Sequence, residues 1–540
     1  MLTYQIIITK LHSVNTITRW ALTLLAGFLL IAAWPVSSLT LLIFVAWIPL
    51  LTLAALPLKK TTFFWHIFIA MLCWNTGTTW WIWNSTDVGT IAAITANSLL
   101  MCIPWLGYRT FLKKYGSRIG YCALVFFWMS FEYIHLNWQI SWPWLSLGNV
   151  FSLHPNWVQW YEYTGIGGGS LLIVATNVFL YEFMLKIRKP AAERKLTKPL
   201  IALTTLALFV IGFAMYYQSR PKTANEQTIQ VVVVQPNINP YAKFTTDSMA
   251  AQIKRLASIS KEQVDSNTQL LVWPETALSA GDWQDNTRSN PLYQPVFELL
   301  TQFPKLSLLS GIEMFVPYGA EKTTPSAHSD GRGGYYDVMN AAMMANARTT
   351  PQYYYKSKLV PGVETLPDFL QVMAPLFEQF GGTSGGYGKS ATSAVLPTAE
   401  GGGQIAPIIC YESIYGEYVG TYVKKGANLL AIITNDGWWG NTPGHKQHLN
   451  FARLRAIETR KWIVRSANTG ISAIINDRGE IVESRPWDTQ AAIKYSVPLH
   501  QGATVYVTYG DVLYNLMLLL AIVSLCWHTW QWLNQRWQKK

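Results

Sequence analysis

Apolar segments long enough to cross a membrane fill most of the first 217 residues and return once near the end of the chain. A spanning helix needs about 20 mainly apolar residues, so a chain with several such segments folds largely within the membrane. We predict about eight spans, of which the first is barely long enough to cross. They lie near residues 17–36, 39–58, 62–83, 90–108, 119–135, 165–185, 199–217 and 511–532.

Lys and Arg are concentrated in every second loop between these segments. They follow the second, fourth, sixth and eighth spans, whereas residues 84–89 and 136–163 contain neither. Basic loops remain on the cytoplasmic side of a membrane, so we expect both termini to be cytoplasmic and residues 222–505 to face outward. Because this placement explains the net charge of +12, we do not expect nucleic acid as a partner.

Residues 222–505 have the composition of a soluble domain, in which short Val-, Ile- and Leu-rich runs alternate with polar helical stretches. This alternation is typical of a layered α/β domain. We therefore predict an N-terminal membrane domain at 1–221, the extramembrane α/β domain at 222–505, and a C-terminal transmembrane helix with a cytoplasmic tail at 506–540. Two stretches rich in Gly, Ser and Thr, 317–334 and 381–393, are expected to be loops, and the second is expected to cover a site.

Cys410 is the only one of the five cysteines that lies outside the apolar segments, and it directly follows the strand-like run 405–409. The extramembrane domain therefore has no cysteine pair for a disulfide or a structural zinc site. We expect no metal and no other cofactor. Two further reactive candidates precede Cys410, namely Glu275 in Trp-Pro-Glu-Thr and Lys356 in Tyr-Tyr-Lys-Ser-Lys-Leu-Val-Pro.

An acid, an amine and a thiol together permit acyl transfer through a thioester. A cysteine attacks as the thiolate, and Glu275 can take its proton and later return it to a leaving group. Lys356 can place a fixed positive charge beside the oxyanion. Each residue also has a structural alternative, because a lone cysteine is more often part of a core, an acid can cap a helix, and Lys356 and Lys358 can form a solvated pair. This scheme requires no histidine, and neither His445 nor His448 has a partner spacing that demands one.

The chain order Glu, Lys, Cys and the segments around these residues resemble the nitrilase, or carbon–nitrogen hydrolase, superfamily. The resemblance covers about 280 residues and implies an αββα-sandwich fold, with Glu275 as the base, Lys356 as the oxyanion partner and Cys410 as the nucleophile. It rests on Val-Trp-Pro-Glu-Thr-Ala at 272–277, Tyr-Tyr-Lys-Ser-Lys-Leu-Val-Pro at 354–361, Ile-Ile-Cys-Tyr-Glu at 408–412, Thr-Asn-Asp-Gly-Trp-Trp-Gly at 434–440 and Arg-Ala-Ile-Glu at 455–458.

With membrane spans on both sides of this domain, the whole chain resembles the apolipoprotein N-acyltransferases of bacteria. The resemblance implies that Glu364, Tyr411 and Glu412 are also needed for activity. Two positions depart from the family pattern. The usual Pro-Phe-Gly-Glu is Pro-Gly-Val-Glu at 361–364, and Phe244 stands in place of a tryptophan, so that an aromatic side chain is kept for packing an acyl chain.

The same resemblance implies a function and a location. The sn-1 acyl chain of a phospholipid would pass to Cys410 and then, in a ping-pong reaction, to the N-terminal α-amine of a diacylglyceryl-cysteine apolipoprotein. The protein would be a multi-pass component of the bacterial inner membrane with its catalytic domain on the periplasmic side. One alternative is a membrane-tethered amidase acting on small amides, which leaves the spans as an over-large anchor. Another is a transporter or scaffold, which predicts a broken triad.

Overall fold

The computed structural model describes residues 14–35, 37–190, 196–219, 227–240, 248–366 and 386–538. The chain forms two compact units, each of which draws on separated parts of the sequence. The first, here called the helical unit, consists of Met1–Trp80, Thr90–Ser219 and Asp511–Lys540. The second, here called the sheet unit, consists of Trp81–Gly89 and Arg220–Gly510.

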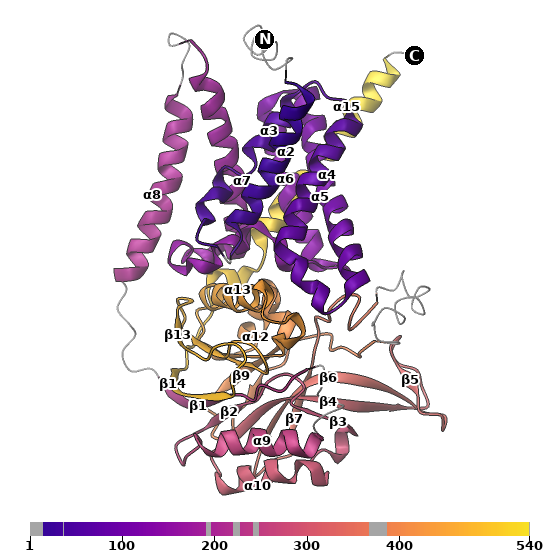
Figure 1. The fold of residues 1–540 in the computed structure, drawn as a ribbon, viewed down its shortest axis with the longest axis vertical. Coiled ribbons are helices and arrows are strands. Elements are labelled where there is room, and N and C mark those ends of the chain that lie inside the picture. The colour runs from indigo at the N-terminus through magenta and orange to yellow at the C-terminus, as the bar shows by residue number, and fades with distance from the viewer. Residues whose placement is uncertain are drawn as a thin grey trace. The chain divides into compact units, whose positions relative to one another are not determined.

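The helical unit is an assembly of long helices (Figure 1). Among the described residues, five of its helices are long and apolar enough to cross a membrane, namely α2, α5, α6, α7 and α15. The predicted count of about eight spans is therefore not confirmed. The helices are α2 (Thr16–Ala33), α3 (Ile48–Ala55), α4 (Lys60–Thr79), α5 (Asp87–Tyr115), α6 (Ser117–Asn137), α7 (Tyr161–Ile187), α8 (Thr197–Ser219) and α15 (Val512–Trp537).

The span predicted near 39–58 differs most from the structure. A short 3-10 helix, η1 (Thr40–Phe44), precedes the eight-residue helix α3, which has Pro49 in its first turn. Proline has no backbone N–H and clashes with the preceding turn, so it begins a helix more readily than it continues one. The apolar run is therefore broken into two pieces, a division that hydropathy alone does not report.

The long helices leave many apolar side chains exposed, as the environment of a lipid bilayer requires. Helix α15 exposes Leu516, Leu519, Ile522 and Val523, each at about half of its full accessible area or more. A contiguous apolar surface of this kind is rare on a soluble monomer. In lipid, however, it faces hydrocarbon rather than water, which supports the membrane assignment of this unit.

One buried acid ties three distant parts of the helical unit together. Glu132 of α6 is 3% exposed. Its carboxylate accepts hydrogen bonds from Trp128 Nε1 (2.9 Å), the backbone N–H of Leu147 (2.9 Å), Ser170 Oγ (2.6 Å) and Tyr514 Oη (2.7 Å). A buried carboxyl group without such donors would be strongly destabilising, so these contacts fix the 3-10 helix η4 (Leu147–Leu153), α7 and α15 against α6.

The sheet unit contains two mixed sheets. The first has the order β14-β1-β2-β4-β6-β5, with β3 also paired to β4 and β7 to β6, and the second has the order β13-β12-β11-β10-β9-β8. The strands of the first are β1 (Thr228–Gln235), β2 (Leu270–Val272), β3 (Leu278–Trp283), β4 (Ser307–Gly319), β5 (His328–Ser329), β6 (Tyr335–Asn346), β7 (Gln352–Tyr355) and β14 (Ala491–Pro498). Those of the second are β8 (Leu396–Pro397), β9 (Gln404–Ile409), β10 (Leu429–Thr434), β11 (Ile463–Ala467), β12 (Ala473–Ile475) and β13 (Ile481–Ser484).

The two sheets face each other and are covered by helices, which confirms the predicted αββα sandwich (Figure 1). Side chains alternate along β1, because successive residues of a strand point to opposite faces. Val231 and Val233 join the core between the sheets, whereas Val232 and Val234 pack under the helices of the first sheet. These helices are α9 (Met249–Lys261) and α10 (Gln294–Gln302), and α12 (Gly416–Lys424) and α13 (Pro443–Thr459) cover the second sheet.

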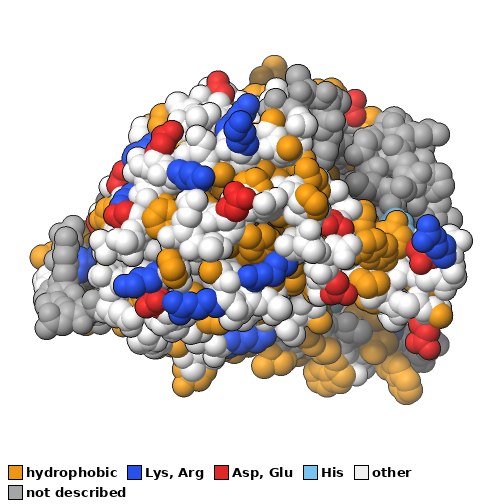
Figure 2. Space-filling model, turned by 90° about the horizontal axis from the view of Figure 1, so that it is seen from below, with side chains coloured by type: hydrophobic (Ala, Val, Ile, Leu, Met, Phe, Trp, Pro, Cys, Tyr) orange, Lys and Arg blue, Asp and Glu red, His pale blue; other side chains and the backbone are white. Residues whose placement is uncertain are grey.

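The predicted loops agree with the structure only in part. The stretch 317–334 carries the end of β4, which runs to Gly319, and the short strand β5. Residues 381–385 of the second predicted loop lie outside the described residues, as does Phe244. Seen from the side of α9 and α10, side chains of both charges are dispersed over the sheet unit (Figure 2), as on a face that meets water.

Residues 81–89 connect α4 to α5 along the chain but belong to the sheet unit. Trp81 is fully buried and packs edge-on against Trp439, with 4.8 Å between ring centroids. Asn84 Nδ2 donates to the carbonyl oxygen of Trp439 at 2.8 Å. A Cβ atom on Gly444, in the first turn of α13, would lie 2.6 Å from the Trp81 ring, so glycine is needed for this close approach.

The buried Trp81 should therefore stabilise the sheet unit. We expect Trp81→Ala to cost about 3–5 kcal/mol, the usual range for emptying a buried aromatic site, and to lower the thermal unfolding midpoint by several degrees. Trp83→Ala is the matched control, because Trp83 is in the same segment but is 51% exposed. Circular dichroism of the full chain in detergent measures both, and equal midpoints for the two variants would contradict this packing role.

Candidate active site

Each of the three predicted reactive residues follows the carboxyl end of a strand, two of them in the first sheet and one in the second. Lys356 comes directly after β7, Cys410 directly after β9, and Glu275 three residues after β2. Strands β2 and β4 are parallel, and β7 is two antiparallel pairings away from β4, so β7 runs in the same direction as β2. Glu275 and Lys356 therefore lie at the same edge of the first sheet, and Cys410 lies at the carboxyl end of β9 in the facing sheet, where sites in α/β folds form.

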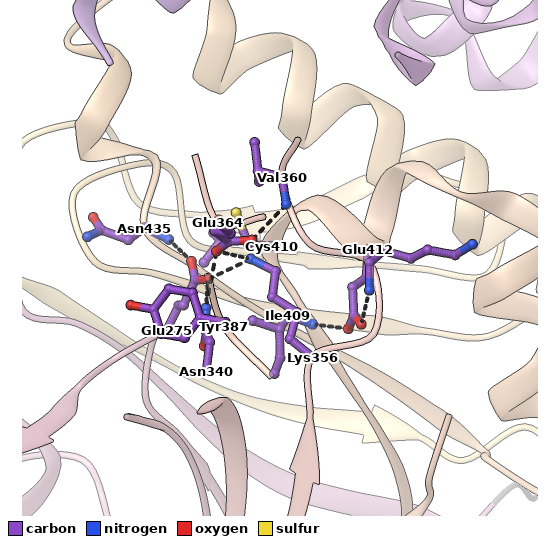
Figure 3. Close-up of polar contacts among 12 residues, drawn as sticks. Glu275, Asn340, Lys356, Val360, Glu364, Tyr387, Ile409, Cys410, Glu412 and Asn435 are labelled. Carbon is purple, nitrogen blue, oxygen red and sulfur yellow. Dashed lines mark hydrogen bonds and ion pairs between the residues drawn. The ribbon is translucent and has the colours of Figure 1, made fainter. Parts of the chain in front are cut away.

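Lys356 lies at the centre of the site and pairs with two carboxylates (Figure 3). Its Nζ is 3.1 Å from Glu275 Oε1 and 2.8 Å from Glu364 Oε1. The lysine side chain is 1% exposed. Burial disfavours the charged amine, but the charges of Glu275 and Glu364 outweigh it and hold the pKa of Lys356 well above its usual range. The residue is therefore a fixed cation.

Two asparagines that sequence reasoning missed complete the environment of Glu275. Asn340 Nδ2 donates to Glu275 Oε1 at 2.8 Å, and the backbone N–H of Asn435 donates to Oε2 at 3.2 Å. Asn340 lies in the middle of β6, where nothing in the local sequence distinguishes it. Asn435 lies within the stretch 434–440, whose resemblance to the family implies no role for this residue.

A close backbone contact fixes the position of Glu275. The N–H of Gly311 donates to the carbonyl oxygen of Pro274 at 3.1 Å. A Cβ atom at Gly311 would come within 2.6 Å of backbone atoms of Pro274, Glu275 and Thr276. Only glycine allows β4 to approach this segment so closely, and the approach holds the Glu275 carboxylate next to Lys356.

The glycine that departs from the family pattern has a clear structural role. Gly362 adopts a φ of +80°, a left-handed conformation that favours glycine. The resulting turn brings the N–H of Glu364 to the carbonyl oxygen of Val360 at 2.9 Å, and the N–H of Val360 donates to Glu364 Oε2 at 2.8 Å. The carboxylate of Glu364 therefore reaches Lys356 even though the glycine has moved.

Glu412 joins the segment after β7 to the end of β9. It is fully buried, and Oε1 accepts from the N–H groups of Ser357 (2.7 Å) and Lys358 (3.2 Å), whereas Oε2 accepts from that of Ile409 (2.9 Å). Tyr354 Oη donates to Oε1 at 2.5 Å. The Glu412 carboxylate thus fixes Tyr354 and Ser357, on either side of Lys356, relative to Ile409, the residue before Cys410. Tyr411, which precedes Glu412, is buried as well.

Cys410 itself is partly exposed. Desolvation by the surrounding protein and the charge of Glu275 raise the pKa of its thiol well above the usual range, and the nearby Lys356 opposes them. The resting site thus holds a neutral thiol beside a carboxylate that can take its proton. Figure 3 shows Glu275, Lys356, Glu364 and Cys410 converging from separate segments. Among the residues that the structure describes, no group of three or more His, Cys, Asp or Glu residues is placed to hold a metal ion.

Comparison with known proteins identifies the family of the chain. A sequence model described as carbon-nitrogen hydrolase matches residues 230–505, about half of the chain. The chain therefore belongs to the carbon–nitrogen hydrolase family. A second model, described as the apolipoprotein N-acyltransferase N-terminal domain, matches residues 26–179.

Three relatives that match most of the chain share one name, which is more specific than that of the family. The chain is 29% identical over 509 residues to the apolipoprotein N-acyltransferase of Chlorobaculum tepidum, covering 93% of this chain and 94% of that protein. It is 27% identical to the enzyme of the same name from Geobacter metallireducens (91% and 92% covered) and 26% identical to that from Thermotoga maritima (79% and 75% covered). The expected resemblance to apolipoprotein N-acyltransferases is thereby confirmed.

The charges around Cys410 predict opposite effects of two substitutions on its thiol. Glu275→Gln removes a negative charge that raises the thiol pKa, so alkylation of Cys410 by iodoacetamide at pH 8 should become several-fold faster. Lys356→Met removes the charge that lowers it, so alkylation should become slower. Mass spectrometry of the Cys410 peptide measures both rates separately from the other four cysteines. Rates that change in the same direction would contradict this electrostatic account.

Proposed function

We propose that the chain is an N-acyltransferase that acylates lipoproteins at their N-terminal amine. The observation that carries this proposal is the presence, in one chain, of a carbon–nitrogen hydrolase domain and an apolipoprotein N-acyltransferase N-terminal domain. The acyl donor is the sn-1 ester of a phospholipid, and the acceptor is the α-amine of a diacylglyceryl-cysteine. Both substrates have long apolar tails, which gives the apolar helices of the chain a purpose beyond anchoring.

The first half of the reaction forms a thioester on Cys410. Glu275 takes the thiol proton as Cys410 Sγ attacks the ester carbonyl carbon, and negative charge moves onto the carbonyl oxygen. The ammonium of Lys356 and the backbone N–H after Cys410 stabilise this oxyanion, an effect worth on the order of 10²–10³ in rate for each donor. The ester C–O bond then breaks, and Glu275 returns the proton to the alkoxide, so that lysophospholipid leaves.

The second half transfers the acyl group to nitrogen. The neutral α-amine of the acceptor attacks the thioester carbonyl, and Glu275 takes one amine proton. When the tetrahedral intermediate collapses, the C–S bond breaks, the thiolate regains the proton, and an amide remains. Glu364 keeps the Lys356 charge in place throughout, because its carboxylate pairs with the same ammonium group as Glu275 does.

A labelled donor tests the first step. We expect phospholipid labelled in its sn-1 chain to leave a hydroxylamine-sensitive label on Cys410, and phospholipid labelled at sn-2 to leave none. Cys410→Ala should abolish both labelling and transfer, a loss beyond detection. A synthetic diacylglyceryl-cysteinyl peptide should discharge the label, whereas the same peptide with an acetylated amine should not. Hydrolysis of small amides without any lipid label would instead support the amidase alternative.

We also propose which side of the membrane each part of the chain faces. The first described turn of α2 and the last turn of α15 lie at one end of the helical unit (Figure 1), and the basic loops alternate along the sequence. These features support cytoplasmic termini and a periplasmic sheet unit in the bacterial inner membrane.

Reporter fusions test this orientation. A fluorescent protein that matures only in the cytoplasm should be bright when fused after Lys540. Alkaline phosphatase, which is active only in the periplasm, should be active when inserted at the exposed turn around Gly331 and inactive after Lys540. The reverse pattern of activities would overturn the proposed sidedness.

A further inference from the structure

The nucleophile occupies an unusual backbone conformation. Cys410 has a φ of +49°, in the left-handed region that residues with a side chain rarely adopt. It stands where β9 passes into the short 3-10 helix η10 (Cys410–Ile414). Such strained residues persist only where the surroundings over-determine them, and they cluster at functional sites. The contacts that hold the peptide group of Cys410 therefore bear directly on where its sulfur points.

Two side chains hold the carbonyl oxygen of Cys410. Ser413 Oγ donates to it at 2.7 Å, and His448 Nε2 lies 3.1 Å from it. His448 Nε2 is also 2.9 Å from Ser413 Oγ. The carbonyl oxygen only accepts hydrogen bonds, and Ser413 uses its single hydrogen on that oxygen. His448 Nε2 thus faces two oxygens, and its contact with the Cys410 carbonyl is a hydrogen bond in the form of the ring that carries a hydrogen on Nε2.

The other ring nitrogen of His448 is fixed by a buried ionic network. His448 Nδ1 lies 2.9 Å from Asp436 Oδ1, and Arg465 Nη2 donates to Asp436 Oδ2 at 2.6 Å. All three side chains are fully buried. Although burial opposes ionisation of Asp436, the charge of Arg465 holds its pKa below the usual range. The imidazole orientation is thus set from behind by a carboxylate and an arginine, as catalytic histidines are in other enzymes.

We propose that His448 is a positioning residue, which holds Cys410 in its left-handed conformation by donating from Nε2 to the Cys410 carbonyl oxygen. The residue touches no reacting atom. It acts through the backbone, and Asp436 and Arg465 act through it. This inference rests on the proposed role of Cys410 as the nucleophile. It assigns a function to a histidine that the Glu–Lys–Cys scheme leaves unused.

Two conservative replacements of His448 test the hydrogen bonds of its two ring nitrogens separately. The amide nitrogen of glutamine is as many bonds from Cβ as Nε2, so His448→Gln can still donate to Cys410. The amide nitrogen of asparagine corresponds to Nδ1, so His448→Asn keeps the contact to Asp436 but loses the one to Cys410. The matched control is His445→Gln, because His445 lies one turn earlier in α13, is 1% exposed, and contacts Asn441 and Trp487.

We expect His448→Asn to lower kcat for acyl transfer about 100-fold, the usual effect of a misplaced reactive group, with KM for phospholipid changed less than about twofold, since no substrate contact is lost. His448→Gln should recover at least about tenfold of that loss. His445→Gln should match the unaltered protein. A kcat in His448→Asn within about threefold of the unaltered value, or His448→Gln no better than His448→Asn, would overturn the proposal.

Two further measurements separate folding and function. Ser413→Ala removes the second donor to the Cys410 carbonyl oxygen with a small change in volume. It should lower kcat about tenfold if the hydrogen bonds to that oxygen position Cys410. An unchanged kcat would count against the proposal even if both His448 variants failed to fold.

Iodoacetamide labelling of Cys410 needs no lipid substrate. A slower labelling rate in His448→Asn, restored in His448→Gln, supports the positioning role even if the proposed acyl transfer is wrong, and equal labelling rates in all variants contradict it.

Discussion

The buried ammonium group of Lys356 is the constraint on which the site depends. A lone charge in a protein interior costs several kcal/mol, and removing one partner of a buried pair typically costs about 3–5 kcal/mol. A buried Lys356 therefore needs carboxylate partners. These partners are Glu275 and Glu364, which are 81 and 8 residues away in sequence. Asn340 then donates to Glu275 as well. One charge thus draws strands β2, β6 and β7 and the turn at Gly362 into a single arrangement.

Cys410, the proposed nucleophile, is held differently from the charge of Lys356. Lys356 is fixed through its side chain, whereas Cys410 is fixed mainly through its backbone. Glu412 accepts from the N–H of Ile409, the residue before Cys410, and the Ser413 and His448 side chains hold the carbonyl oxygen. Preorganisation of this kind is most effective when the fixed groups are buried and the reacting atom is reachable. The partly exposed Cys410, next to fully buried Glu412 and His448, fits that requirement.

Sequence patterns predicted the parts of this protein that depend on local order. Alternating runs predicted a layered α/β domain, and the motif resemblance implied the αββα sandwich. The structure brings Glu275, Lys356 and Glu364 together. The features that sequence reasoning missed depend on pairing between distant segments. Asn340 lies in an ordinary strand, and His448 reaches Cys410 only because α13 packs against η10, which follows β9. The packing of Trp81 against Trp439 joins residues that hydropathy assigns to different parts of the chain. Pro49 breaks an apolar run that composition alone presents as continuous.

The position of Tyr514 in the chain has a consequence for how the protein is made. Tyr514 donates to Glu132 across a sequence separation of 382 residues. Ribosomes add about 5–20 residues per second, so roughly 20–80 s pass between the synthesis of the acid and of this donor. During that interval, Trp128, Leu147 and Ser170 are the described donors to this acid that have already been synthesised. The hydrogen bonds of Glu132 are therefore completed only when α15 packs against α6, after residues 220–510 of the sheet unit have been translated.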